Sequence, residues 1–89
     1  MADEQGGWRY VVLKPAQKYL ERMQPDEQLR IVEALDTLLT APEMLDIKPL
    51  KGRPELRLRV GKYRVLFIED QEAHTYVVTV IGARGDVYK

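Results

Sequence analysis

The chain has 89 residues, a formal net charge of zero, one histidine and no cysteine. This length predicts one domain with a single small core. The lack of cysteine excludes a disulfide framework and a thiolate metal site, and the lone His74 excludes a metal site built on a pair of histidines. No apolar run approaches the ~20 residues of a membrane span, and the polar start does not resemble a signal peptide, so we expect a cytoplasmic protein.

Residues 1–7 are polar and predict a flexible leader, followed by one domain at residues 8–89. The first element of that domain is a strand at residues 8–13, which is rich in β-branched and aromatic side chains. A short helix follows, because Pro15 suits a first helical turn and the apolar residues after it recur at i, i+3, i+4 and i+7. These apolar residues are Ala16, Tyr19, Leu20 and Met23.

A second helix is predicted from Pro25, with Asp26 and Glu27 in its first turn, where the helix dipole favours negative charge. Pro42 ends it, because a residue before proline avoids the helical conformation. Its wide apolar stripe has Ile31 on the flank and consists of Leu29, Val32, Leu35, Leu38 and Leu39. Residues 42–54 contain three prolines and Gly52, so they predict a connecting loop.

The segment at 56–68 predicts a β-hairpin, because apolar residues alternate with arginines up to a Gly61-Lys62 loop. Glycine in the first loop position suits a type II′ turn, which pairs Val60 with Tyr63 and Arg59 with Arg64. A polar turn and a final strand at 74–81 follow. His74 is interpreted as a surface turn residue without a chemical role. The order β-α-α-β-β-β predicts an α+β domain, with an antiparallel sheet and both helices packed on one face.

Basic charge is concentrated in residues 48–64, which contain seven Lys and Arg residues against one acid, Glu55. The hairpin pairing places Arg57, Arg59 and Arg64 together on one sheet face, where they repel one another unless an anion lies between them. A merely soluble face would mix both signs of charge, although that simpler interpretation stays open. The pattern favours a defined anionic ligand.

Three segments, at 50–52, 56–67 and 81–88, resemble the RelE toxins of the RelE/ParE superfamily, and the order of elements agrees. The resemblance implies a ribosome-dependent endoribonuclease that cuts mRNA in the A site by attack of the 2′-hydroxyl, without a metal or cofactor. It also implies a RelB-like antitoxin, in an oligomeric complex that binds operator DNA through the antitoxin.

By position, the resemblance assigns four catalytic residues. Arg64 matches an arginine that stabilises the phosphate, and Arg84 matches one that assists the leaving group. Tyr88 matches a tyrosine that stacks on or orients the base, and Arg57 matches one of two lysines linked to activation of the 2′-hydroxyl. The remaining basic residues of the patch and tail are expected to bind RNA: Lys48, Lys51, Arg53, Arg59, Lys62 and Lys89.

Two positions depart from the family pattern. Glu55 stands where the second lysine is expected, and Ala83 stands where many relatives carry His or Lys. Three alternatives therefore stay open: a ParE-like inhibitor of DNA gyrase, a degenerate toxin that only binds its antitoxin, and a non-catalytic RNA-binding module. The last is disfavoured because Tyr63 and Phe67 fall on the predicted core face rather than on an exposed one.

Overall fold

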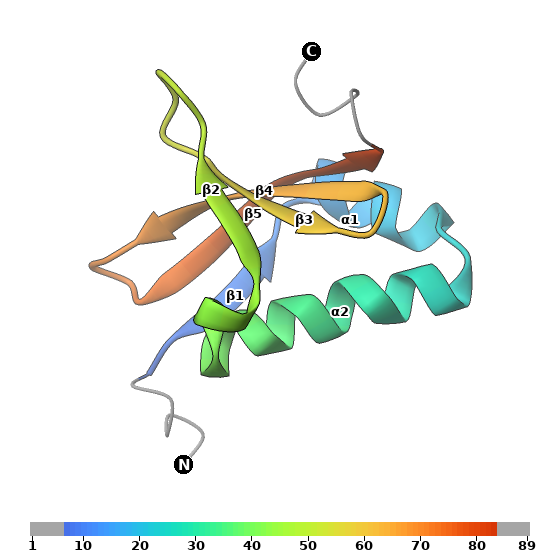
Figure 1. Ribbon diagram of the computed structural model, residues 1–89, viewed down its shortest axis with the longest axis horizontal. Coiled ribbons are helices and arrows are strands. Elements are labelled where there is room, and N and C mark those ends of the chain that lie inside the picture. The colour runs from blue at the N-terminus through green and yellow to red at the C-terminus, as the bar shows by residue number, and fades with distance from the viewer. Residues whose placement is uncertain (1–6, 84–89) are drawn as a thin grey trace.

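The computed structural model describes residues 7–83, in which a five-stranded sheet carries two helices on one face (Figure 1). The predicted α+β class is confirmed, as are the two helices. Apart from Gly7, the predicted leader lies outside the described residues. The elements are β1 (Arg9–Val12), α1 (Lys14–Arg22), α2 (Pro25–Thr40), the 3₁₀ turn η1 (Pro42–Met44), β2 (Asp46–Pro49), β3 (Leu56–Val60), β4 (Tyr63–Asp70) and β5 (Thr75–Ala83).

The sheet has the strand order β1-β5-β4-β3-β2 and is mixed rather than purely antiparallel. Strands β2 to β5 form the predicted antiparallel meander, but β1 lies parallel to β5, with Arg9 opposite Thr75 and Val12 opposite Val78. Two helices separate β1 from the meander, and a helical connection of this kind is what allows parallel pairing. The first and last strands within residues 7–83 are therefore neighbours.

The prediction of a loop at 42–54 is wrong in part, because that segment contains β2. This strand pairs with β3 and places Asp46 opposite Arg59 and Lys48 opposite Arg57. Pro49 at its end argued against a strand, but β2 is an edge strand, where the missing N–H of proline is tolerated. The meander thus gains one strand at the edge beside β3.

The predicted hairpin is confirmed residue by residue, with Val60 opposite Tyr63 and Arg59 opposite Arg64. Gly61 has a φ of 58°, and Lys62 does not have a positive φ. A positive φ at the first loop position alone is the pattern of a type II′ turn, as expected. The hairpin therefore separates its two faces in the predicted way.

The core lies between the helices and one sheet face, which contributes Leu58, Val65, Phe67, Val78 and Ile81. From α2 the buried residues are Ile31, Ala34, Leu35 and Leu38. The buried face of α2 is therefore rotated around the helix axis relative to the predicted apolar stripe, since Ile31 is fully buried whereas Leu29 is 55% exposed. The buried set keeps the i, i+3, i+4, i+7 spacing, with the small residue Ala34 at one of its positions.

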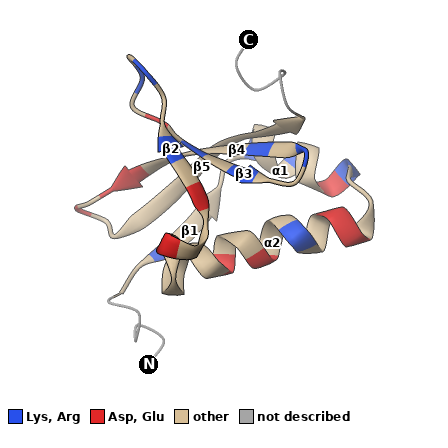
Figure 2. Ribbon diagram, viewed as in Figure 1, with Lys and Arg blue, Asp and Glu red and all other residues tan. Residues whose placement is uncertain are grey.

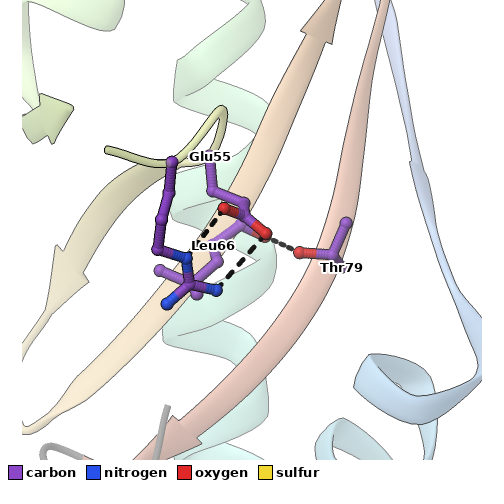
Figure 3. A network of polar contacts seen from close by, with 4 residues as sticks. Glu55, Leu66 and Thr79 are labelled. Atoms are coloured by element: carbon purple, nitrogen blue, oxygen red, sulfur yellow. Dashed lines mark hydrogen bonds and ion pairs between the residues drawn. The ribbon is translucent and has the colours of Figure 1, made fainter. Parts of the chain in front are cut away.

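A β-bulge shifts the pairing of β4 with β5, because Leu66 lies opposite Val80 while Phe67 lies opposite Val78. The extra residue, Thr79, donates a hydrogen bond from Oγ1 to the Leu66 carbonyl oxygen over 3.3 Å (Figure 3). His74 lies in the turn before β5 with a φ of 50°, and its ring stacks on Trp8 at 5.2 Å. The interpretation of His74 as a turn residue is thereby confirmed.

Candidate active site

The sheet face turned away from the helices, here called the outer face, contains the predicted arginines. The β3–β4 register places Arg59 across from Arg64 and Arg57 across from Leu66, and strand alternation directs all four away from the core face. Leu66 is fully buried, although it is not part of the core cluster beneath the helices. The predicted grouping of three arginines on one face is therefore confirmed.

The arginines on β3 are partly neutralised by an acid that the sequence analysis did not assign. Asp46 Oδ1 accepts a hydrogen bond from Arg57 Nη2 at 2.8 Å, and Asp46 Oδ2 lies 3.6 Å from Arg59 Nε. Arg57 is 9% exposed, so its guanidinium is packed as well as paired. The Nε of Arg57 is buried and has no hydrogen-bond partner among residues 7–83, which leaves one donor of that guanidinium unused there.

Arg64 differs from the other two because it forms no ion pair within residues 7–83. It is only 4% exposed, and its buried Nε has no hydrogen-bond partner in the described part of the chain. Its only described side-chain hydrogen bond is from Nη1 to the carbonyl oxygen of Tyr63, over 3.4 Å. A buried guanidinium with unused donors is expensive for the fold and is therefore well suited to receive an anion.

Glu55, the first departure from the family pattern, lies just before β3, and its side chain is mostly buried. Its carboxylate is paired with Arg53, whose Nε lies 3.2 Å from Oε1 (Figure 3). This pair neutralises one positive charge of the basic segment at 48–64. Glu55 is consequently the partner of an exposed loop arginine and not a free carboxylate.

The other basic residues predicted to bind RNA, apart from Lys89, are distributed over β2, β3 and the loops at the two ends of β3 (Figure 2). Lys48 is exposed on β2, opposite Arg57, so it lies on the outer face. Lys51 and Arg53 belong to the loop between β2 and β3, whereas Lys62 lies in the hairpin loop at the opposite end of β3. Lys62 Nζ is 5.7 Å from the centre of the Tyr63 ring.

Three predicted site residues, Arg84, Tyr88 and Lys89, lie outside the described residues. The structure does fix where the chain leaves the described part, because Gly82 is opposite Arg64 and Ala83 is opposite Tyr63. The chain therefore continues toward Arg84 from a point next to Arg64, the buried arginine of the outer face. Among residues 7–83, no group of three or more His, Asp or Glu side chains is placed to hold a metal ion, and no helix is long and apolar enough to cross a membrane.

Two side chains with displaced pKa values, Tyr10 and Tyr76, lie among the residues packed against the core. Burial raises the pKa of Tyr10 most, followed by the charge of Asp36 and by the hydrogen bond that the phenol donates to Asp36 Oδ1. Burial and then the charge of Glu69 raise the pKa of Tyr76. These shifts concern stability on the helix side of the sheet and not the outer-face arginines.

Comparison with known proteins agrees with this geometry. The family model described as the ParE toxin of the type II toxin–antitoxin system parDE matches residues 10–87. The chain is also 34% identical over 76 residues to the curated "Putative toxin RelE1" of Methanocaldococcus jannaschii, a match that covers 81% of this chain and 84% of that protein. The chain is a RelE-type toxin of the RelE/ParE superfamily.

Solved structures of RelE-type toxins share the fold. The archaeal RelE–RelB complex of Pyrococcus horikoshii superimposes with a TM-score of 0.75 at 25% identity, covering 88% of this chain and 96% of that one. The isolated RelE toxin of E. coli gives a TM-score of 0.73 at 20% identity, covering 91% of this chain and 90% of that one. Several of these structures are complexes of RelE with RelB.

In this RelE-type toxin, Asp46 is the outer-face residue that the sequence analysis missed. The signal was available, because an Asp-Ile-Lys alternation followed by proline fits a short edge strand that turns one acid toward the arginines. Arg57, Arg59 and Arg64 are brought together as predicted, with Lys48 beside them. The two ends of this group of basic residues are formed by the loops that flank β3, with Lys51 and Arg53 at one end and Lys62 at the other.

Proposed function

We propose that this RelE-type toxin is an endoribonuclease that cleaves mRNA in the ribosomal A site. The observation that supports it most strongly is Arg64, a buried guanidinium without an ion-pair partner within residues 7–83, set beside two further arginines. Such a group is a preorganised donor for charge that develops on a phosphate. Burial of the guanidinium limits its hydration, which strengthens that interaction.

The proposed reaction uses the RNA itself as the nucleophile. The 2′-oxygen forms a bond to phosphorus while the bond from phosphorus to the 5′-oxygen breaks. The 2′-hydroxyl therefore loses a proton, and the departing 5′-oxygen gains one. Arg64 and Arg57 stabilise the negative charge of the pentacovalent phosphorane, Arg84 assists the leaving oxygen, and Tyr88 stacks on a base. The more peripheral residues that contact the RNA backbone are Lys48, Lys51, Arg53, Arg59, Lys62 and Lys89.

Arginine is a poor general base, because its pKa lies above ~12. We therefore expect cleavage to depend on the ribosome, which would hold the message with its 2′-oxygen in line with the phosphate. Cleavage of naked RNA is expected to be slow for the same reason.

Primer extension on message bound to purified ribosomes tests the proposal. Wild-type toxin is expected to cut within codons, and Arg64→Ala to abolish those cuts. Arg22→Ala is the matched control, because Arg22 is an exposed arginine on α1 and should retain wild-type activity. Uncut message with a correctly folded wild-type toxin would exclude the proposed activity.

A second candidate, inhibition of DNA gyrase, is favoured by one observation, since the matching family model is described as a ParE toxin. A supercoiling assay with purified gyrase distinguishes the two: inhibition together with intact message supports the gyrase candidate. A chain without either activity that still binds an antitoxin would match the degenerate alternative suggested by Glu55.

We further propose a RelB-like antitoxin as the partner, in a complex that is oligomeric and binds operator DNA through the antitoxin. The similarity to RelE in RelE–RelB complexes supports this partner. An acidic antitoxin segment would be steered to the basic surface at 48–64, so its association rate should fall sharply with added salt. An association rate that is independent of ionic strength would contradict this electrostatic contribution.

A further inference from the structure

Asp46 lies between two arginines of the outer face, and the proposed reaction gives its carboxylate no role. The residue belongs to the edge strand β2 and is directly opposite Arg59 on β3. Its two oxygens serve different partners, because Oδ1 is 2.8 Å from Arg57 Nη2 and Oδ2 is 3.6 Å from Arg59 Nε. One carboxylate therefore bridges two guanidinium groups.

The two contacts differ in strength. The Arg57 side chain is 10% exposed, so its short hydrogen bond to Asp46 is a charge-assisted contact at the edge of the protein interior. The Arg59 side chain is 47% exposed and Asp46 is 43% exposed, and an ion pair of 3.6 Å between such groups is weak and easily exchanged. Asp46 thus fixes Arg57 and holds Arg59 loosely.

We propose that Asp46 is an internal counterion. In the free toxin its carboxylate binds Arg59 where an RNA phosphate would bind, and it also orients Arg57. A carboxylate and a phosphodiester both offer two oxygens to a guanidinium, so one can replace the other. On RNA binding, Arg59 exchanges Asp46 for a phosphate, whereas Arg57 keeps its bond to Asp46. Asp46 is therefore a positioning residue. The predicted effect on cleavage rests on the proposed function, whereas the predicted effect on RNA binding does not.

This arrangement predicts opposite effects of one substitution on binding and on cleavage. Removal of the Asp46 charge frees Arg59 and eliminates a negative charge near the phosphate, so RNA binds more tightly. The same change releases Arg57 from its fixed orientation, so the bound RNA is cleaved more slowly. A substitution that merely loosened the fold would weaken both.

The predicted effect on binding is tested by fluorescence anisotropy over a range of KCl concentrations. The probe is a short single-stranded RNA in which every 2′-hydroxyl is methylated, so that the toxin cannot cleave it. Asp46→Asn is expected to bind about fivefold more tightly at low salt, the factor for one unit charge about 4 Å from a phosphate in water. Its salt dependence should steepen by about 0.7 in log–log slope if Arg59 gains one phosphate contact. Glu33→Gln, an equal charge change on the exposed face of α2, should leave both values unchanged.

The cleavage half uses single-turnover reactions at saturating toxin on programmed ribosomes. Asp46→Asn is expected to cut at least about tenfold more slowly than wild type, the loss typical of a misplaced catalytic group. Asp46→Glu, which restores the carboxylate, should recover part of that rate. Thermal unfolding of every variant reports the folded fraction, and Asp46→Ser provides a second neutral variant should Asp46→Asn fold poorly.

The outcomes separate this inference from the proposed function. If both neutral variants bind the methylated RNA no more tightly than Glu33→Gln, or cleave at the wild-type rate, Asp46 is not a counterion of the site. If wild-type toxin does not cut ribosome-bound message at all, the proposed function fails, while tighter binding by Asp46→Asn still supports the exchange of carboxylate for phosphate on Arg59.

Discussion

Arg64 and Gly82 lie directly opposite each other across β4 and β5, and Gly82 adds no side chain to the outer face beside the guanidinium. Arg64 is nevertheless almost completely buried, and its Nε has no partner among the residues that the structure describes. Burial of an incompletely paired charge opposes folding, so stability alone does not account for an arginine at this position. This conflict between folding and function leads to the first prediction.

Arg64→Met is expected to raise stability while it abolishes cleavage. Methionine keeps an unbranched apolar stem in the same space but removes the desolvated charge, and replacements of this type are often neutral or stabilising by about 1–4 kcal/mol. A gain of about 1 kcal/mol corresponds to a rise in Tm of about 4–8 °C for a domain of this size. Differential scanning calorimetry measures this, and a lower Tm in Arg64→Met would mean that the guanidinium is better satisfied than its contacts indicate.

Arg57→Ala is expected to destabilise the fold more than Arg59→Ala. The Arg57→Ala substitution removes a short, part-buried hydrogen bond to Asp46, which should lower the free energy of unfolding by about 1.5–3 kcal/mol. Arg59 loses a half-exposed ion pair, which should cost less than about 1 kcal/mol. Urea unfolding measures the loss of unfolding free energy for both variants. If Arg57 and Asp46 are coupled, Arg57→Ala should cost less unfolding free energy in a protein that already carries Asp46→Asn. Equal losses from the two arginines would contradict the unequal contacts.

Gly61→Ala is expected to cost about 1–2 kcal/mol, because the hairpin turn needs a left-handed backbone at that position. A β-carbon there would also lie 2.9 Å from Arg30 Nη2, a flexible side-chain end that can move. Gly52→Ala is the matched control, since Gly52 has a φ of 73° and no crowding atom within 4 Å. Chemical denaturation should therefore give similar losses for both glycines, and a much larger loss at Gly61 would show that Arg30 is held rigidly.

Stability is expected to fall at high pH through Tyr10. In the unfolded chain this phenol ionises near the ordinary tyrosine pKa of 10.0, while in the folded chain burial and Asp36 raise the pKa. The folded state then holds the proton more tightly, so the contribution to stability is complete below pH 10.0 and is lost as the pH rises through 10.0 toward the raised value. Tyr10→Phe should reduce this decline in pH-dependent urea unfolding, with a residual decline from Tyr76.

Asp36→Asn provides the control for that experiment, because it removes the charge of Asp36, the second cause of the Tyr10 shift, and leaves burial, the largest cause. Its stability should decline less steeply than wild type above pH 10.0. A wild-type slope in both Tyr10→Phe and Asp36→Asn would assign the decline to other groups.

Tyr88 is expected to act through its ring in the proposed reaction. Tyr88→Phe should retain most of the ribosome-dependent activity, because the stacking surface is kept. Tyr88→Ala should lose about 1–3 kcal/mol of transition-state stabilisation, the usual effect of removing one stacking platform. Equal damage from both substitutions would assign the role to the hydroxyl. A matching loss of thermal stability, with unchanged activity per folded molecule, would assign Tyr88 to packing.

The parts of the fold that could be predicted from sequence are those fixed by neighbouring residues. The Gly61-Lys62 loop determines the register of its own hairpin, and with it the shared face of Arg57, Arg59 and Arg64. The prolines at 15 and 25 mark helix starts for an equally local reason. None of these inferences needs knowledge of a distant partner.

The remainder depends on tertiary contacts that a local pattern does not contain. Strand β2 exists because β3 is beside it, and so the pairing of Asp46 with Arg57 could not be read from a segment that resembled a loop. The side of α2 that is buried is decided by where the sheet lies, which turned Leu29 outward and Ala34 inward. The burial of Arg64 likewise depends on neighbours from other strands.

The parallel pairing of β1 with β5 has a consequence for how the chain is synthesised. Arg9 and Thr75, which are 66 positions apart in sequence, must meet before the sheet can close. During translation β1 has no strand partner until residues 75–78 have been made, whereas the hairpin of β3 and β4 can form earlier from local contacts. We therefore expect nascent chains that stop before β5 to remain unfolded and susceptible to proteases, so that the toxin acquires its active fold only after β5 has been synthesised.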